Sequence, residues 1–385
     1  MRRCPMDEHG RKLAQCMGFE KERDEATPLI NVLVVEDSPV VREFLVHVLG
    51  GDPGIRVVGT ARDGEEALDA VRRYRPDVIT MDIHMPNMDG LEATRHIMET
   101  DPTPIVIVSG SSDPNETAMT FRAMEAGALA VLMRPNGIGH PDHETTAREL
   151  VQTVKLMSEV KVVRRWPRVR RDAPVPPLVK VGLARVPAPA PMRIVAIGAS
   201  TGGPPALHTI LAGLPKAFPV PLLIVQHMAP GFIRGFAEWL AQSASLPVHV
   251  ATHGETLFPG RVYVAPDEFQ MKVGHSGKIV LTGDPPEYGL RPSVSYLFRS
   301  VAEVYGCDAV AGLLTGMGRD GAGELRLLKE KGAVTFAQDK DSSVVHGMPG
   351  EAIRLDAATF VLPPDKIAAV LVNLANHRGK KGRDP

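Results

Sequence analysis

Three polar residues in the second half of the chain each follow an apolar run of the length expected for a buried parallel strand. Ser200 comes after Ile-Val-Ala-Ile-Gly-Ala, His227 closes Pro-Leu-Leu-Ile-Val-Gln-His, and Asp320 follows Ala-Val-Ala-Gly-Leu-Leu-Thr-Gly-Met-Gly-Arg. Parallel strands that are buried on both faces read as such runs. Chemistry in an open α/β sheet collects beyond the carboxyl ends of the strands, so we expect the three side chains to share one edge. Serine, histidine and aspartate together are typical of nucleophilic acyl transfer.

The chain is long enough for two domains with separate cores. It has 385 residues and a formal net charge of −1, and no apolar stretch approaches the length of a membrane span. Neither the net charge nor the apolar stretches indicate binding to nucleic acid or insertion into a membrane. The three cysteines, Cys4, Cys16 and Cys307, form neither a CxxC pair nor a zinc spacing, which predicts reduced thiols and a cytoplasmic location.

Alternating apolar strands and amphipathic helices divide the sequence into two α/β units. Residues 29–160 contain five strand-then-helix units, which predict a five-stranded, doubly wound parallel sheet. A Pro/Arg-rich linker is expected over residues 161–191, followed by a second doubly wound parallel sheet over residues 192–377. We expect residues 1–28 to form a disordered extension and residues 378–385 a basic tail. The strands predicted for the first unit are Asn31–Glu36, Arg56–Ala61, Asp77–Asp82, Ile105–Ser109 and Ala128–Met133.

Carboxylates stand at the ends of two predicted strands of the first unit. Glu36 and Asp37 end one strand, and Asp82 ends another. Three carboxylates at one edge repel each other unless a hard cation joins them, and Mg²⁺ prefers oxygen ligands. One carboxylate could then accept a phosphoryl group, with the hydroxyl of Ser109 binding a phosphoryl oxygen. The alternative is that these residues only cap helices, but the full set at successive strand ends favours a phosphoryl site.

Residues 29–157 resemble the receiver domain of response regulators. The resemblance implies that Asp82 is the phosphoacceptor, that Glu36, Asp37 and Asp82 bind Mg²⁺, and that Ser109 is the switch hydroxyl. It also implies a sensor histidine kinase as the phosphodonor.

Two positions of the receiver switch depart from that pattern. Arg134 stands where receivers carry a lysine before the proline of the last strand, and Val131 stands where they usually carry an aromatic residue. A planar guanidinium does not replace a compact ammonium at a tight phosphoryl site. We therefore expect phosphorylation to be chemically possible and its coupling to an output to be weakened.

The second unit contains a G-x-S-x-G pattern, which is a weak signal by itself. In an ordinary α/β-hydrolase the histidine comes last in the chain, which would require His346 or His377. The strand-end order of serine, histidine and aspartate fits the sequence better. Glycines around Asp320 free backbone N–H groups for an oxyanion or a phosphate. Neither glycine run matches a dinucleotide-binding or Walker A loop.

Residues 192–372 closely resemble the chemotaxis protein-glutamate methylesterases, the CheB family. The motifs that carry the resemblance are Gly-Ala-Ser-Thr-Gly-Gly-Pro, Gln-His-Met, Val-Ala-Pro, Arg-Pro-Ser-Val and Leu-Leu-Thr-Gly-Met-Gly-Arg-Asp-Gly. The resemblance implies that Ser200 is the nucleophile, His227 the general base and Asp320 the carboxylate that orients it.

The same resemblance implies an oxyanion pocket with a backbone donor from Met317 and walls shaped by Thr201. It further implies a serine-type enzyme that hydrolyses glutamyl γ-methyl esters, and deamidates some glutamines, on methyl-accepting chemotaxis receptors. Ester hydrolysis of this kind needs no cofactor. The receiver would cover the catalytic edge until phosphorylation of Asp82 moves it.

Two other functions are compatible with the sequence. One is a signalling or binding module with a degenerate receiver and weak or no esterase activity, which the departures at Arg134 and Val131 keep open. The other is a general hydrolase of small esters. Comparing a soluble ester with methylated receptor as substrates separates these readings.

Overall fold

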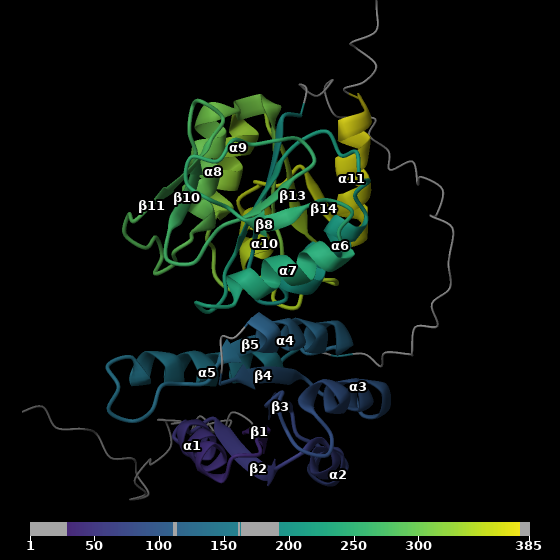
Figure 1. The fold of residues 1–385 in the computed structure, drawn as a ribbon, viewed down its shortest axis with the longest axis vertical. Helices are drawn as coiled ribbons and strands as arrows, with labels where there is room; N and C mark the ends of the chain where they lie inside the picture. Colours follow the sequence, from purple (N-terminus) through teal and green to yellow (C-terminus); the bar gives the residue numbers. More distant parts are fainter. Residues whose placement is uncertain (1–28, 111–113, 161, 163–191, 378–385) are drawn as a thin grey trace, which may run out of the picture.

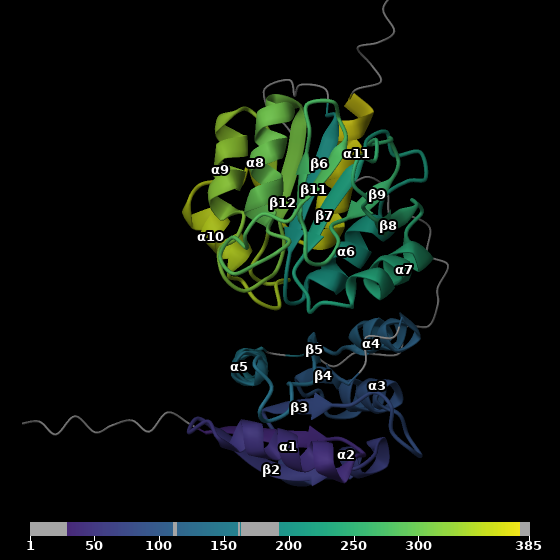
Figure 2. The ribbon, with the colours of Figure 1, turned by 60° about the vertical axis from the view of Figure 1, so that its left-hand side comes forward.

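The computed structural model describes residues 29–110, 114–160, 162 and 192–377, which form two α/β units (Figures 1 and 2). Each unit is built around its own parallel sheet. The extension and the tail expected at the two ends, and all but one residue of the expected linker, lie outside the described residues. None of the described helices is both long and apolar enough to cross a membrane.

The first unit has the strand order β2-β1-β3-β4-β5, which is a doubly wound arrangement. Helices α1 and α5 contact each other on one side of the sheet, and α2, α3 and α4 contact in sequence on the other. The strands are β1 (Ile30–Val35), β2 (Ile55–Ala61), β3 (Val78–Met81), β4 (Ile105–Ser109) and β5 (Ala130–Met133). The helices are α1 (Pro39–Gly50), α2 (Gly64–Tyr74), α3 (Gly90–Thr100), α4 (Pro114–Ala126) and α5 (His143–Ser158).

The predicted doubly wound sheet is confirmed, with small shifts at the strand ends. Pairing between β1 and β3 stops at Val35 and Met81, so Glu36 and Asp82 follow their strands instead of belonging to them. Strand β5 begins two residues later than predicted, because the N–H of Ala128 still bonds to the carbonyl of Ala123 in α4. These shifts leave the acidic side chains at the edge where they were expected.

The second unit has a seven-stranded sheet in the order β14-β13-β12-β6-β7-β9-β8, and its neighbouring strands pair in parallel. The strands of this sheet are β6 (Ile194–Ala199), β7 (Leu222–Gln226), β8 (Val248–Val250), β9 (Val262–Val264), β12 (Ala309–Leu313), β13 (Val334–Gln338) and β14 (Phe360–Leu362). The helices are α6 (Gly203–Ala212), α7 (Ile233–Ser243), α8 (Val294–Val304), the 3-10 helix η1 (Gly306–Asp308), α9 (Ala322–Glu330), α10 (Met348–Arg354) and α11 (Pro364–His377).

An antiparallel hairpin was not predicted. Its strands, β10 (Gln270–Val273) and β11 (Ile279–Thr282), pair only with each other and precede α8. Period-two alternation is short in both strands, and no dipeptide typical of a two-residue hairpin turn joins them. The hairpin supports the loop that leads into α8.

Strand β6 lies between β7 and β12 at the centre of the second sheet. The chain leaves β6 toward β7 through α6, whereas the neighbour on its other side, β12, comes much later in the sequence. Ligands in open α/β sheets bind outside the carboxyl ends of the strands at such a topological switch point. The residues that follow β6, β7 and β12 therefore occupy the expected position of a site.

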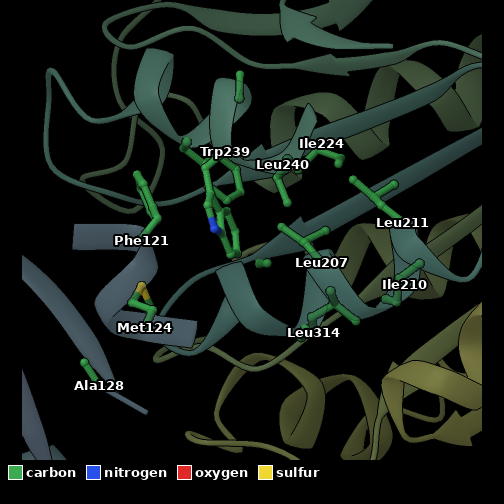
Figure 3. Close-up of a cluster of buried hydrophobic side chains, with 14 of the residues drawn as sticks. Phe121, Met124, Ala128, Leu207, Ile210, Leu211, Ile224, Trp239, Leu240 and Leu314 are labelled. Carbon is green, nitrogen blue, oxygen red and sulfur yellow. The ribbon is translucent and has the colours of Figure 1, made fainter. Parts of the chain in front are cut away.

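The two units pack together through aromatic side chains (Figure 3). Phe121 of α4 stacks on Trp239 of α7 at a ring-centroid distance of 5.4 Å and tilts against Phe236 at 5.4 Å. His208 of α6 stacks on Trp239 at 4.9 Å, and the indole N–H donates to Glu125 of α4 at 2.9 Å. Because Phe121 and Trp239 are each only 2% exposed, the apolar cores of the two units are continuous at this contact.

We expect Phe121→Ala to weaken the packing between the units. Truncating a buried phenylalanine costs about 3 kcal/mol or more, and here that loss falls on the interface. The fluorescence of Trp239, measured in a Trp166→Phe background, should shift to the red, and small-angle scattering should give a larger radius of gyration. Phe258→Ala, which removes an exposed ring, is the control. Unchanged emission and radius in Phe121→Ala would contradict the packing described.

Candidate functional site

Ser200, His227 and Asp320 lie at the carboxyl edge of the second sheet, after β6, β7 and β12. Ser200 directly follows β6, and its N–H donates to the carbonyl of Thr315 beyond β12 at 3.0 Å. His227 directly follows β7, and its N–H donates to the carbonyl of Ala199 at 2.9 Å. Asp320 ends the turn that joins β12 to α9. Backbone ladders thus fix the nucleophile candidate relative to both neighbouring strands.

The carboxylate of Asp320 is buried and fully hydrogen-bonded. Oδ2 accepts from His227 Nε2 at 2.9 Å and from the N–H of Val294 at 2.6 Å, while Oδ1 accepts from the Ser293 hydroxyl at 2.9 Å and the N–H of Ser295 at 3.0 Å. Burial raises the pKa of Asp320, but the hydrogen bond and charge of His227 and the bonds from Ser295 outweigh it and lower the pKa to about 2. The group is therefore an ionised acceptor.

An ionised Asp320 determines the protonation of the His227 ring. A carboxylate can only accept, so Nε2 must carry the proton and Nδ1 keeps the lone pair. Nδ1 is then the atom available to remove a proton from a neighbouring hydroxyl. Within the described residues the Ser200 hydroxyl makes no hydrogen bond to His227, and such bonds often tighten only when substrate is bound.

Gln226 was not predicted as a site residue, although it stands in the Gln-His-Met motif. Its side-chain amide donates to the carbonyl of Ser200 at 2.9 Å and to the carbonyl of His227 at 2.8 Å. A Cβ at position 203 would lie 2.1 Å from the Gln226 Oε1 atom, which explains the glycine there. The Gln226 side chain therefore ties the turn of the nucleophile to the end of the base's strand.

The turn Gly316–Gly318 carries the predicted oxyanion donor, Met317. The N–H of Gly316 donates to the carbonyl of Val345 at 2.9 Å, and the carbonyl of Gly316 accepts from the N–H groups of Gly347 and Met348. A Cβ added to Gly316 would lie 2.6 Å from the Cβ of Ser200, so this turn touches the nucleophile candidate.

The other predicted pocket residue, Thr201, is tied to the same turn. Its carbonyl accepts from the Thr315 hydroxyl at 2.9 Å. The structure therefore holds the Thr201 backbone beside the segment that leads into the Met317 turn.

The late histidines are placed differently from His227. The backbone of His346 forms a bridge with Gly316, but its ring bonds to the Ser343 hydroxyl at 3.4 Å, and burial lowers its pKa. His377 is the last residue of α11. The residue that contacts Asp320 is His227, so the geometry matches the strand-end order of serine, histidine and aspartate.

The first unit gathers carboxylates at the corresponding edge of its sheet. Ligand oxygens of Glu36, Asp37 and Asp82 all lie within 4.8 Å of one another. Burial, followed by the charge of Asp82, raises the pKa of Glu36 to about 7, and burial also raises the pKa of Asp82. Glu36 Oε2 is buried without a hydrogen-bond partner. An orphaned oxygen among three clustered carboxylates is what a divalent cation would satisfy, so these residues fit a Mg²⁺ ion.

The two remaining switch residues flank that cluster. Arg134 Nη2 lies 3.6 Å from Glu36 Oε2, and its backbone N–H donates to the carbonyl of Ser109 at 2.7 Å. Ser109 is buried at the end of β4. Val131 is half-buried and packs against the apolar cluster that contains Phe121 and Trp239. The guanidinium therefore already faces a carboxylate at the predicted phosphorylation site.

Comparison with known proteins identifies relatives of both units. Residues 195–371 match the family model of the CheB methylesterase, and residues 32–140 match that of the response regulator receiver domain. A protein-glutamate methylesterase/protein-glutamine glutaminase of Nitrosospira multiformis is 69% identical over 352 residues, which cover 91% of this chain and 99% of the relative. The fourth protein of that name from Geobacter metallireducens is 59% identical over 348 residues, which cover 90% and 99%.

Among solved structures, the catalytic domain of the Thermotoga maritima CheB methylesterase is 39% identical to this chain. The match covers 48% of this chain and 100% of that domain, with a TM-score of 0.47.

The Asp320–His227 contact predicts the tautomer of His227. In ¹⁵N-edited NMR spectra, the neutral ring should be protonated at Nε2, and Asp320→Asn should shift the ring signals of His227, because the carboxylate that fixes the proton is lost. Glu255→Gln is a matched control, since Glu255 accepts from His249 Nε2 at 2.7 Å in an analogous pair. That control should shift the signals of His249 only. A wild-type His227 protonated at Nδ1 would contradict the arrangement.

Proposed function

This chain belongs to the CheB methylesterase family, and on that premise we propose that it hydrolyses glutamyl γ-methyl esters on methyl-accepting chemotaxis receptors. The observation that carries the proposal is the buried Asp320–His227 pair beside Ser200 at the switch point of the second sheet. The names of the relatives, protein-glutamate methylesterase/protein-glutamine glutaminase, favour this function over a degenerate binding module. The same names support deamidation of glutamines, because both reactions can share one acyl intermediate.

The chemistry follows from the protonation of the site. His227 Nδ1 removes the proton of the Ser200 hydroxyl as its oxygen attacks the ester carbonyl carbon, and Asp320 stabilises the imidazolium. The imidazolium then protonates the leaving methoxide, which departs as methanol. A water molecule, deprotonated by the same nitrogen, hydrolyses the acyl-serine to a free glutamate and restores the hydroxyl. With a glutamine substrate the leaving group is ammonia. None of these steps requires a cofactor.

Backbone N–H groups would stabilise the oxyanion that develops in both tetrahedral intermediates. The N–H of Met317 is the proposed donor, and the hydrogen bonds that hold Gly316 on both of its polar groups support it. A donor fixed in this way needs no reorganisation during the reaction, which is the source of its catalytic effect. Thr201, whose carbonyl accepts from the Thr315 hydroxyl, would help to shape the pocket.

The receiver would control this site through phosphorylation of Asp82 by a sensor histidine kinase in the cytoplasm. Glu36, Asp37 and Asp82 would hold Mg²⁺, whose charge offsets that of the incoming phosphoryl group. Ser109 would bind a phosphoryl oxygen. Arg134 lies 3.6 Å from Glu36, so its guanidinium must divide its charge between that carboxylate and the phosphoryl group.

Contacts between the units support control by occlusion. Helix α4 packs against α6, which begins directly after the turn of the nucleophile, and against α7. Val345 of the second unit belongs to a buried cluster otherwise made of receiver residues, and Val344 packs against the same cluster. The carbonyl of Val345 also accepts from the N–H of Gly316 in the proposed oxyanion turn. Moving the receiver would therefore disturb both borders of the site.

Ser200→Ala tests the function. Release of methanol from methylated receptor should fall by several orders of magnitude, because loss of a triad member leaves only the oxyanion site and substrate binding. Ser276→Ala, at the exposed turn of the β10–β11 hairpin, should release methanol at the wild-type rate. Activity of Ser200→Ala within about tenfold of wild type would remove this serine from the mechanism. Hydrolysis of a soluble ester without activity on receptor would favour the general hydrolase.

Arg134→Lys tests the switch. After treatment with a small phosphodonor and Mg²⁺, we expect a larger fold-activation of esterase activity in Arg134→Lys than in wild type, because a compact ammonium fits a phosphoryl group better than a guanidinium engaged with Glu36. Asp82→Asn should show no activation by the phosphodonor. Equal fold-activation of wild type and Arg134→Lys would show that the departure at this position is harmless.

A further inference from the structure

An exposed tyrosine stands at the tip of a tight turn in the loop between β11 and α8. Tyr288 is 62% exposed, and it and Gly289 both have positive φ, +53° and +78°. The flanking residues exchange backbone hydrogen bonds, from the N–H of Glu287 to the carbonyl of Leu290 at 3.1 Å and in reverse at 2.8 Å. A non-glycine residue with left-handed backbone is uncommon, so the turn presents this ring at a conformational cost.

The turn is anchored at its base by two buried or half-buried groups. Arg299 of α8 donates to both carboxylate oxygens of Glu287 at 2.9 Å. The side-chain amide of Gln270, which is fully buried, donates to the carbonyls of Pro285 and Leu290 at 3.2 Å. A bidentate guanidinium and a buried amide hold the tip in one geometry before any partner arrives.

The same anchor reaches the catalytic carboxylate. Gln270 Oε1 accepts from the N–H of Ser293 at 2.8 Å, and the Ser293 hydroxyl donates to Asp320 Oδ1 at 2.9 Å. Hydrogen bonds through Gln270 and Ser293 therefore link the turn with Tyr288 to the carboxylate of Asp320.

A cation from the catalytic turn completes the arrangement. Arg319 directly precedes Asp320, is exposed, and has its Cζ 5.6 Å from the centre of the Tyr288 ring. Among the described residues no carboxylate lies within ion-pair distance of Arg319. Glu351 senses its charge at longer range, but the Glu351 carboxylate pairs with Arg354 at 2.7 Å. A guanidinium stacked on an aromatic face keeps its N–H groups free to bind an anion in the plane of the fork.

We propose that Arg319 and Tyr288, together with the exposed side chain of Met317, form a rim patch that binds the acidic receptor segment around the scissile ester. Met317 is 55% exposed and belongs to the same turn as Arg319. Arginine and tyrosine, with an adjacent exposed methionine, are the side chains enriched at interfaces that must recognise a partner. The inference rests on the proposed function, because it concerns the substrate of that site.

The chemistry of the substrate explains the charge of the patch. The methyl ester itself is neutral, so Arg319 gains nothing from pairing with the group that is cleaved. Each turnover leaves a glutamate, so a receptor segment with several such positions becomes more anionic as the reaction proceeds. Arg319 would pair with a carboxylate next to the remaining ester and raise affinity for segments that are already partly demethylated.

Kinetics with methylated receptor as substrate test the rim patch. For Arg319→Glu we expect KM to rise about tenfold or more, with a much smaller change in kcat, as when an interfacial charge pair is replaced by repulsion. Arg319→Lys should keep part of the affinity, and Tyr288→Ala should raise KM less than Arg319→Glu.

The methylation state of the substrate gives a second test. In wild type, KM should be lower for partly demethylated than for fully methylated receptor, and it should rise with salt. The dependence of KM on methylation and its dependence on salt should both shrink in Arg319→Gln.

Arg326→Glu is the matched control, because Arg326 lies on the exposed face of α9, where it pairs with Glu330. It carries the same charge change and should leave KM and kcat at the wild-type values. A wild-type KM in Arg319→Glu, or an equal rise of KM in Arg326→Glu, would overturn the rim patch while leaving the proposed function intact. Failure of the wild-type protein to release methanol from receptor would instead overturn the proposed function.

Discussion

The catalytic half of this protein depends on keeping one carboxylate ionised inside the fold. Asp320 is 2% exposed, and an unpaired charge at that depth would be expelled or neutralised. Four donors prevent this: the imidazole of His227, the hydroxyl of Ser293 and the backbone N–H groups of the first two residues of α8. Removing one partner from such a buried network typically costs about 3–5 kcal/mol, so the start of α8, which supplies three of the four donors, contributes to keeping Asp320 ionised.

The need to keep Asp320 ionised explains several hydrogen bonds around the central strands of the second sheet. The antiparallel hairpin and Gln270 position the segment that begins α8, and Ser293 both caps this helix, by accepting from the N–H of Tyr296, and bonds to Asp320. Gln226 positions Ser200 and His227 in a comparable way, since its side-chain amide donates to both of their carbonyls. Neither glutamine reacts in the proposed mechanism. Both fix groups whose separation decides whether a proton can pass between them.

The two units use the same architecture for opposite electrostatic purposes. In the second unit, hydrogen bonds hold the pKa of Asp320 far below its ordinary value. In the first unit, burial and the charge of Asp82 outweigh the charge of Arg134 and the hydrogen bond from Ser38, so they raise the pKa of Glu36 to about 7, and its Oε2 atom is buried without a hydrogen bond. The carboxylate of Asp320 is therefore an anion, which would orient His227 in the proposed mechanism. The carboxylates of the first unit would instead gain a cation, and cation binding there would be one step in switching the proposed receiver.

The sequence by itself determined the two doubly wound sheets and the position of their sites. Continuous apolar runs such as Ile194–Ala199 can only be buried on both faces, and polar residues placed after them must then meet at the carboxyl edge. Ser200, His227 and Asp320, and the acidic cluster of the first unit, are predicted in this way from the sequence alone. Gln226, Gln270 and Ser293 are not predicted in this way, because a buried amide or hydroxyl has no periodicity that separates it from an ordinary polar residue.

Only the tertiary structure decided how those residues are connected. His227 Nε2 and the N–H of Val294 at the start of α8 both bond to Asp320, and these contacts join segments that are distant in the chain. The stacking of Phe121 on Trp239 likewise joins helices of different units. The sequence does not distinguish an apolar side chain of α4 that packs on its own sheet from one that packs on the second unit. Sequence periodicity reports that a face is buried, and the three-dimensional arrangement alone determines what buries it.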